Sequence, residues 1–168
     1  FGSLSSGRYM GGGAGGASPT RGFFFGGLIS GQPAGERIIE SVSFASGGAA
    51  SKFGDLTVGR RAIAAVTNNT RAVSCSGDTP ATNTMDFIVM ATEGNATDFG
   101  DITNQADGYG AGGSNATRGV LSGSSPSNTN RIDYITFSTT GNATDFGDTT
   151  YGSYLNGACS DSHGGLGE

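Results

Sequence analysis

A three-residue motif returns along this chain at almost constant spacing. Phe53-Gly54-Asp55 is followed by Phe99-Gly100-Asp101 and by Phe146-Gly147-Asp148, so the phenylalanines lie 46 and then 47 residues apart. The residues before the last two copies, 94–98 and 141–145, are identical. Repetition at a fixed period of this length indicates a tandem array, in which each unit buries its apolar face against its neighbours.

Further markers keep the same period. A basic residue follows Ser or Thr four times, at Thr20-Arg21, Thr70-Arg71, Thr117-Arg118 and Ser162-His163. Phe1-Gly2-Ser3 resembles an earlier copy of the motif, 52 residues before Phe53. We expect the 168 residues to form a single repeat domain. The markers divide it into repeats at 1–52, 53–98 and 99–145 and a half-repeat at 146–168.

The pattern within one repeat predicts up to four short strands and an all-β fold. In the second repeat the expected strands are Arg61–Val66, Ala72–Ser76 and Met85–Ala91, with a short fourth strand around Phe99. The first segment would tolerate a helix, but its equivalent, Gly108–Ser114, is too rich in glycine to hold one. Equivalent segments share one conformation, so both are predicted to be strands.

A four-stranded unit of about 46–47 residues has the size of a β-propeller blade. Three and a half blades do not make an ordinary ring, which usually needs roughly 4–8 of them. Three arrangements remain open: completion by further residues, completion by a second chain, or another mode of stacking. Because the chain begins at Phe1 rather than Met, we expect it to be a processed product or part of a longer polypeptide.

Composition and charge indicate which binding partners this protein can have. Glycine takes 32 positions and only 14% of residues are charged. Such chains are often disordered, but here the glycines recur between apolar runs, as ordered strands and tight turns require. A net charge of −5 makes a nucleic-acid partner unfavourable. No apolar run approaches the roughly 20 residues of a membrane span, so we expect no membrane insertion.

Acidic residues recur once per repeat and are the first candidates for a catalytic site. They are Glu40, Asp86 and Asp133 in one set, and Asp55, Asp101 and Asp148 in another. A catalytic pair of carboxylates needs one particular geometry rather than a copy in every repeat. The favoured interpretation is that these acids cap turns and accept hydrogen bonds from backbone amides.

Segments 95–101 and 142–148 place several side-chain oxygens close together, which raises the alternative of a calcium site. Calcium takes about six to eight oxygen ligands. There is no EF-hand spacing, and the first repeat has Lys52 where the others have an aspartate. A turn motif is therefore favoured, with calcium kept as an alternative.

Ser160, Asp161 and His163 could be drawn as a catalytic triad. Successive side chains on a strand point to opposite faces, so this spacing offers no support for it. His163 also occupies the repeat position of Arg21. We therefore interpret His163 as a structural residue of the repeat rather than as a general base.

The other candidate groups are interpreted as structural. Cys75 and Cys159 lack the CxxC spacing of a zinc site and are expected to be buried or half-buried thiols. The glycines at 11–16 are not followed by the Gly-Lys-Ser/Thr ending of a phosphate loop. The Asn-x-Thr sequons are expected to be turn residues; they begin at Asn68, Asn95, Asn115 and Asn142. We therefore expect no catalytic, cofactor or metal site, and no enzymatic activity.

The order of these features resembles the Kelch repeat. That family has an arginine before an inner strand, a Gly-Gly pair, an aromatic strand and a late tryptophan. Arg60 or Arg61, Gly26-Gly27 and Tyr134 fit the first three places, and Phe53, Phe99 and Phe146 stand where the tryptophan would be. The chain contains no Trp, and the glycine pair is replaced by Ser-Gly at 76–77 and 122–123.

Nearly the whole chain also resembles a group of repeat proteins encoded by tailed phages of marine cyanobacteria. The segments that carry the likeness are 132–137, 141–148 and 160–166. The resemblance implies an external virion protein, such as a tail fibre or appendage module for host attachment, and its likeness at 160–166 implies the C-terminal part of a longer chain. The expected partners are other virion proteins, further copies of the chain and host surface polysaccharide. The alternative is a purely structural or decoration subunit that holds a tail, capsid or filament together by interchain contacts.

Overall fold

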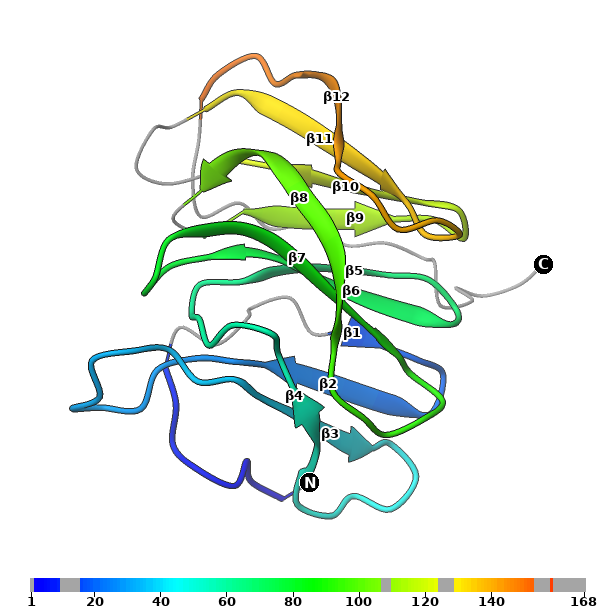
Figure 1. The fold of residues 1–168 in the computed structure, drawn as a ribbon. Helices are drawn as coiled ribbons and strands as arrows, with labels where there is room; N and C mark the ends of the chain where they lie inside the picture. Colours follow the sequence, from blue (N-terminus) through cyan, green and yellow to red (C-terminus); the bar gives the residue numbers. More distant parts are fainter. Residues whose placement is uncertain (1, 10–15, 107–109, 124–128, 153–157, 159–168) are drawn as a thin grey trace.

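The structure is a computed structural model that describes residues 2–9, 16–106, 110–123, 129–152 and 158. Over those residues the chain is all-β, with strands and no helix. The strands form three antiparallel sheets of four strands each. Figure 1 shows the sheets stacked in chain order, with the second between the other two. This part of the chain offers no helix that could cross a membrane.

Each sheet is built from four consecutive strands, so every strand pairs with its neighbour in the chain. The first sheet contains β1 (Gly16–Ala17), β2 (Arg21–Phe25), β3 (Ile38–Ser43) and β4 (Ser51–Asp55). The second contains β5 (Ala64–Thr67), β6 (Arg71–Gly77), β7 (Thr82–Val89) and β8 (Thr97–Ala106). The third contains β9 (Ala111–Ser114), β10 (Arg118–Ser122), β11 (Arg131–Thr136) and β12 (Thr144–Asp148). The predicted all-β architecture of four-stranded units is confirmed.

Several strand boundaries differ from the sequence prediction. The strand expected from Arg61 begins only at Ala64, because Ala62 has a φ of 54° and Arg61 forms an isolated bridge with Asp78. The strand expected at Met85–Ala91 is β7, which begins three residues earlier, at Thr82, and ends at Val89. The strand expected to be short around Phe99 is β8, the longest in the structure's described residues, with 10 residues. Its pairing with β7 continues across two shifts of register.

The repeated Phe-Gly-Asp motif lies on the last strand of each sheet, on β4, β8 and β12. A repeat counted from Phe53 or Phe99 therefore starts inside one sheet and ends inside the next. On β4 and β8, the motif strand is the strand that hydrogen-bonds to a loop of the following sheet.

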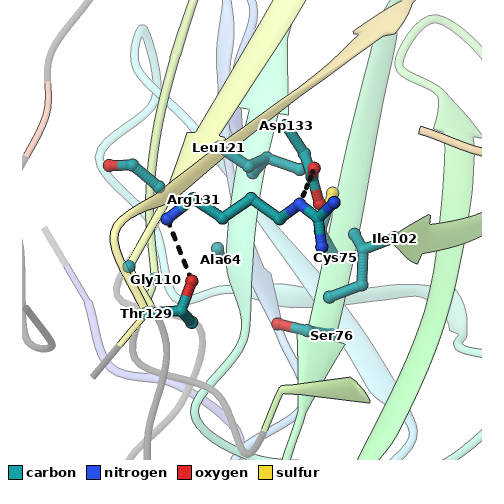
Figure 2. A pocket seen from close by; sticks show the side chains of 11 residues that line it. Ala64, Cys75, Ser76, Ile102, Gly110, Leu121, Thr129, Arg131 and Asp133 are labelled. Atoms are coloured by element: carbon teal, nitrogen blue, oxygen red, sulfur yellow. Dashed lines mark hydrogen bonds and ion pairs between the residues drawn. The ribbon is translucent and has the colours of Figure 1, made fainter. Parts of the chain in front are cut away.

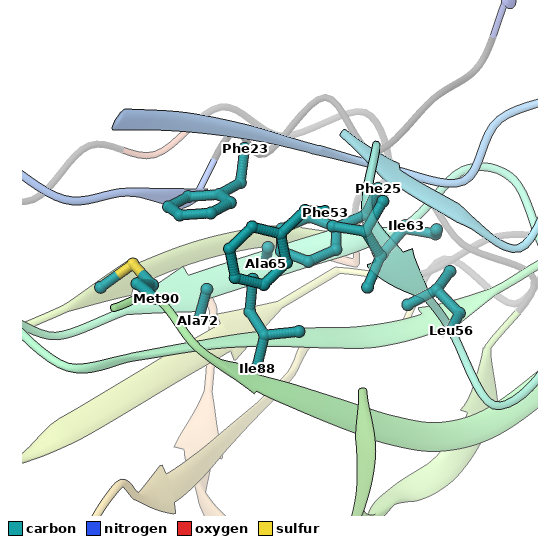
Figure 3. Packing of buried hydrophobic residues seen from close by; sticks show 10 residues of the cluster. Phe23, Phe25, Phe53, Leu56, Ile63, Ala65, Ala72, Ile88 and Met90 are labelled. Carbon is teal, nitrogen blue, oxygen red and sulfur yellow. The ribbon is translucent and has the colours of Figure 1, made fainter. Parts of the chain in front are cut away.

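Apolar side chains from facing sheets form the core. In Figure 3, Phe23, Phe25 and Phe53 of the first sheet meet Ala65, Ala72, Ile88 and Met90 of the second. Phe23 and Phe53 pack edge to face, with ring centroids 5.1 Å apart. A second cluster joins Val73, Met85 and Phe99 to Leu121, Ile135 and Phe137 of the third sheet. Full burial of one such side chain contributes roughly 1.5–3 kcal/mol, so stacking supplies what one sheet lacks.

Candidate functional site

Successive sheets are fastened to each other by main-chain hydrogen bonds. The backbone N–H groups of Gly94 and Ala96, in the β7–β8 loop, donate to the carbonyls of Phe53 (3.0 Å) and Asp55 (2.9 Å) on β4. The same pair of bonds recurs one repeat later, from Gly141 to Phe99 (2.6 Å) and from Ala143 to Asp101 (2.8 Å). We call each such junction a seam.

The asparagines of the identical Gly-Asn-Ala segments complete the seams. The Asn95 Oδ1 accepts a hydrogen bond from the Asp55 backbone N–H at 3.0 Å, and the Asn142 Oδ1 accepts one from Asp101 at 3.0 Å. The motif glycine gives the loop room, because a Cβ on Gly54 would lie 1.9 Å from the Gly94 oxygen. The repeated motif is thus explained as the receiving half of a seam.

The recurrent acids on the third strands are buried and connect each sheet to the chain that enters it. Asp86 accepts hydrogen bonds from the backbone N–H and the hydroxyl of Thr57. Asp133 accepts the same pair from Thr103. Glu40 accepts one from the Ser5 backbone N–H at 2.9 Å. These carboxylates accept hydrogen bonds from backbone amides, as the sequence interpretation predicts, but they lie within strands rather than capping turns.

Two of these acids also pair with buried arginines. The Arg60 guanidinium donates to Asp86 at 3.0 Å and to the Ser74 hydroxyl at 3.0 Å, and both ionic side chains are 0% exposed. Arg8 pairs in the same way with Glu40. Each buried charge therefore has a partner of opposite sign, without which its desolvation would cost several kcal/mol.

The third repeat uses a different arginine. Ala106 and Asp107 stand 46 and 47 residues after Arg60, so no arginine comes from the equivalent position. Arg131, on the same strand as Asp133, instead approaches that carboxylate at 3.5 Å. Figure 2 shows its side chain extended across a small cavity, where it meets Asp133.

That cavity is small and lies between the second and third sheets. Its volume is about 40 Å³, and its lining includes Arg131, Asp133, Cys75, Ser76 and Thr129. A water molecule needs roughly 10–15 Å³ by this measure, so the space suits a few waters rather than a sugar or a nucleotide. The cavity is therefore a feature of the seam between the second and third sheets.

Cys75 lies in the wall of the cavity, and burial suppresses its reactivity. Desolvation raises the pKa of the Cys75 thiol from 9.0 to about 12, with Arg60 opposing the shift and Asp86 and Asp133 adding to it. The thiolate is the reactive form of cysteine, so a thiol with this pKa is a poor nucleophile at neutral pH. Its place in the core fits the buried thiol that the sequence predicts.

Polar turns and loops lie at one end of the strands, along one side of the three stacked sheets. We call this surface the turn end. The turns joining the first two strands of the sheets are 18–20, 68–70 and 115–117, and the loops joining the last two strands are 44–50, 90–96 and 137–143. Asn68 and Asn115 each accept hydrogen bonds from the two backbone N–H groups that close their own turn. The amide of Asn68 also donates to the carbonyl of Ala116 in the next turn, at 3.1 Å.

The turns and loops of the turn end carry little charge. Within them Glu93 is the one ionisable side chain, and it lies 3.8 Å from Arg21. Exposed charged residues stand directly beside them, at the starts of the strands, among them Lys52, Asp98 and Arg118. The Asn, Ser and Thr side chains of the turns can donate and accept hydrogen bonds to a ligand.

The segments considered for calcium use their oxygens inside the protein. Asp98 Oδ1 accepts a hydrogen bond from the Gly100 backbone N–H, and Asp145 Oδ1 accepts one from Gly147, each at 2.9 Å. Asp145 also pairs with Arg131 at 3.1 Å. Among the residues that the structure describes, no three of the acids, Cys and His gather as a metal site. The contacts are those of a turn motif.

Several candidates from the sequence lie outside the described residues. They are Cys159, Ser160, Asp161 and His163, together with the glycines at 11–13 and 15. The remaining sequon asparagines, Asn95 and Asn142, lie in the seams, whereas Asn68 and Asn115 lie in the turn end.

Sequence reasoning missed the roles of Arg8 and Arg60. Arg60 was placed only by its resemblance to a Kelch arginine, and Arg8 was not singled out. Both precede the first strand of a repeat, 52 residues apart, which is the spacing between Phe1 and Phe53. This shared spacing is the signal in the sequence that could have predicted their ion pairs with Glu40 and Asp86.

Comparison with known proteins adds no assignment. No protein-family model matches the chain, and no curated protein matches it.

Proposed function

We propose that this chain is a β-propeller-like module of an external virion protein, such as a tail fibre or appendage, and that its turn end attaches the particle to a host surface. The observation that carries the proposal is the turn end itself. Its turns and loops carry exposed hydroxyl and amide groups with Glu93 as their one ionisable side chain, on a scaffold of stacked sheets. Rigid β scaffolds with variable polar loops commonly serve recognition.

The arrangement of first strands supports the propeller part of the proposal. The first strand of the second sheet, β5, contacts both β1 and β9, which are the first strands of the neighbouring sheets. A propeller places the innermost strands of its blades around a common axis in this way. The three sheets would then be three adjacent blades of a larger ring.

The virion setting is supported by the likeness of segments 132–137, 141–148 and 160–166 to phage repeat proteins. A non-enzymatic role is supported by the use of the repeated carboxylates, which bond to Thr57, Thr103 and Ser5 inside the seams. We propose host surface polysaccharide as the ligand class, since its hydroxyl groups complement the turn end.

The test is binding of the folded protein to purified host polysaccharides on an array. In the test variant, Asn69→Arg with Ala116→Arg, two exposed residues of the turn end carry bulky charges. The matched control is Gln32→Arg, because Gln32 is exposed in the β2–β3 loop at the opposite end. We expect the double variant to lose at least tenfold in affinity while the control binds like the wild type. Failure of the folded wild type on every polysaccharide would overturn the attachment function.

A second candidate is a structural or decoration subunit that holds a tail, capsid or filament together by interchain contacts. The observation that favours it is that large apolar side chains are exposed at both ends of the stack, including Phe24, Phe44 and Phe146. In that role the ends of the stack, rather than the turns, would meet other virion proteins.

A further inference from the structure

Each sheet presents one apolar face to the sheet that follows it, which we call the forward face. It consists of one residue from the second strand, one from the third and the motif phenylalanine. In the first two sheets all of these are at most 3% exposed: Phe23, Ile39 and Phe53, then Val73, Met85 and Phe99. In the third sheet Val120 and Ile132 are half-buried and Phe146 is 56% exposed.

Over the described part of the chain, no loop docks on the outer edge of the third sheet, whereas a loop docks on the edge of each of the other two. A Cβ on Gly100 would meet the backbone of Gly141 at 2.5 Å, because the loop of the next sheet docks there. Gly147 has nearly the same φ as Gly100, 143° against 134°, yet a Cβ on Gly147 would meet nothing within 4 Å. A groove of about 300 Å³ lies beside it, lined by residues that include Phe146, Val120 and Arg118.

The opposite face of each sheet, the backward face, meets the preceding sheet. In the second sheet Ala72, Ile88 and Met90 occupy it, and in the third Leu121, Ile135 and Phe137. All six are at most 8% exposed. The repeat spacing places Phe24, Val42 and Phe44 on the backward face of the first sheet. There Phe24 is 38% exposed and Phe44 is 47% exposed, beside a groove of about 270 Å³.

Residues 2–3 show what this backward face accepts. The Ala50 backbone N–H donates to the Ser3 carbonyl at 3.1 Å, as Ala96 does to Asp55 in the first seam. Ala49 stands where the other loops have Asn95 and Asn142, so this contact has no asparagine bond. The Gly2 backbone N–H also donates to the Gly48 carbonyl at 3.3 Å. The short Gly2-Ser3 segment therefore occupies the place of a Phe-Gly-Asp motif, without the asparagine bond of a seam.

We propose that copies of this chain associate head to tail, with the forward face of the third sheet of one copy on the backward face of the first sheet of the next. Phe146-Gly147-Asp148 would replace Gly2-Ser3 against the loop at 48–50. The occupant is a second copy because one chain carries both halves of a seam in the register of its two internal seams. The motif at 146–148 contacts no loop among the described residues, and the loop at 48–50 is contacted by Gly2-Ser3. The proposal does not rest on the attachment function.

This contact is heterologous, since the two copies use different surfaces. Such contacts generate rings when the rotation between copies closes and open filaments when it does not. The internal seams join the sheets chiefly through peptide groups, so a seam between copies needs no new side-chain recognition.

The test is the concentration dependence of the mass of the intact chain, measured by sedimentation and light scattering. We expect the wild type to form species larger than one 16.7 kDa chain. Phe146→Asp blocks the forward face and Phe44→Asp blocks the backward face, so each variant alone is expected to be monomeric. Tyr9→Asp is the control, because it puts the same charge at a 48% exposed aromatic outside both faces.

The decisive step is to mix the two blocked variants in equal amounts. Each retains the face that the other lacks, so the mixture is expected to give a mixed dimer with twice the mass of one chain and nothing larger. Formation of this dimer also shows that both variants are folded. A wild type that stays monomeric at every concentration would overturn the proposal, as would a blocked variant that still dimerises alone.

Polysaccharide binding can be scored on the same monomeric variants. Loss of self-association with retained binding, or the reverse, separates failure of this proposal from failure of the attachment function.

Discussion

The side chain of Asn95, in the second sheet, accepts a hydrogen bond from the backbone N–H of Asp55, on the last strand of the first sheet, at a distance of 3.0 Å. The same bond joins Asn142 to Asp101 one repeat later. One side chain per seam thus adds to two main-chain bonds, and its absence at Ala49 marks the contact with Gly2-Ser3 as the weaker one.

Removing this side chain should loosen the seam. Because a net hydrogen bond contributes about 0.5–1.5 kcal/mol, we expect Asn95→Ala to lower the free energy of unfolding by that amount. Urea denaturation monitored by circular dichroism measures it. The control is Asn69→Ala, at an exposed turn position. Equal midpoints for the two variants would contradict the role of Asn95 in the seam.

A methyl group on the receiving strand should disturb the seam more than one on the donating loop. At Gly54 a Cβ would lie 1.9 Å from the Gly94 oxygen, whereas a Cβ on Gly94 would meet nothing within 4 Å. We expect Gly54→Ala to cost about 1–3 kcal/mol, as overpacking does, and Gly94→Ala to be close to neutral. Thermal unfolding of both variants tests the order, and a larger loss for Gly94→Ala would show that the contact is misassigned.

Arg60 should matter far more than its neighbour Arg61. Arg60→Met leaves the 0% exposed Asp86 without its counter-charge, which costs about 3–5 kcal/mol when a buried pair is broken. Arg61 pairs with Asp78 at 2.7 Å, but both side chains are about a quarter exposed, so Arg61→Met should cost about 0–1 kcal/mol. Chemical denaturation compares them. Similar losses would mean that the Arg60–Asp86 pair is not buried in solution.

Stability should fall at high pH through Cys75. The thiol ionises near 9.0 in the unfolded chain and near 12 in the folded one, so above pH 9 the unfolded state binds fewer protons and is favoured. This contribution is fully present below pH 9 and is lost between pH 9 and 12, at about 1.4 kcal/mol per pH unit.

The measurement is the free energy of unfolding against pH for the wild type and for Cys75→Ala. We expect a steeper fall for the wild type, whatever the difference between the two at neutral pH. Parallel curves would rule out a buried thiol at this position.

The sequence predicted the repeat and the four-stranded unit because both follow from local patterns. Alternating apolar residues define the strands, and the repeated turns define their order. It did not predict the length of β8, since bulges depend on the partner strand rather than on the residues of β8 alone. It also placed the start of β5 too early, because Arg61 is held by Asp78, 17 residues further on.

The candidate site was less predictable for a related reason. The turn-forming role of the asparagines follows from their own neighbours, as at Asn68 and Asn115. The bond from Asp55 to Asn95 spans 40 residues, and the Arg60–Asp86 pair spans 26. Such contacts are fixed by how the sheets stack, which a single sequence does not state.

The seams join peptide groups, and peptide groups are the same in every protein. A whole unit can therefore be duplicated, lost or exchanged between genes and still fit its neighbour, provided that the motif glycine and the small loop residues remain. The loops that join the last two strands belong to this joint, whereas the turns at 18–20, 68–70 and 115–117 add only the bond between Asn68 and Ala116. If the proposed attachment function holds, the residues of these three turns are free to diverge with the host surface while the array keeps its architecture.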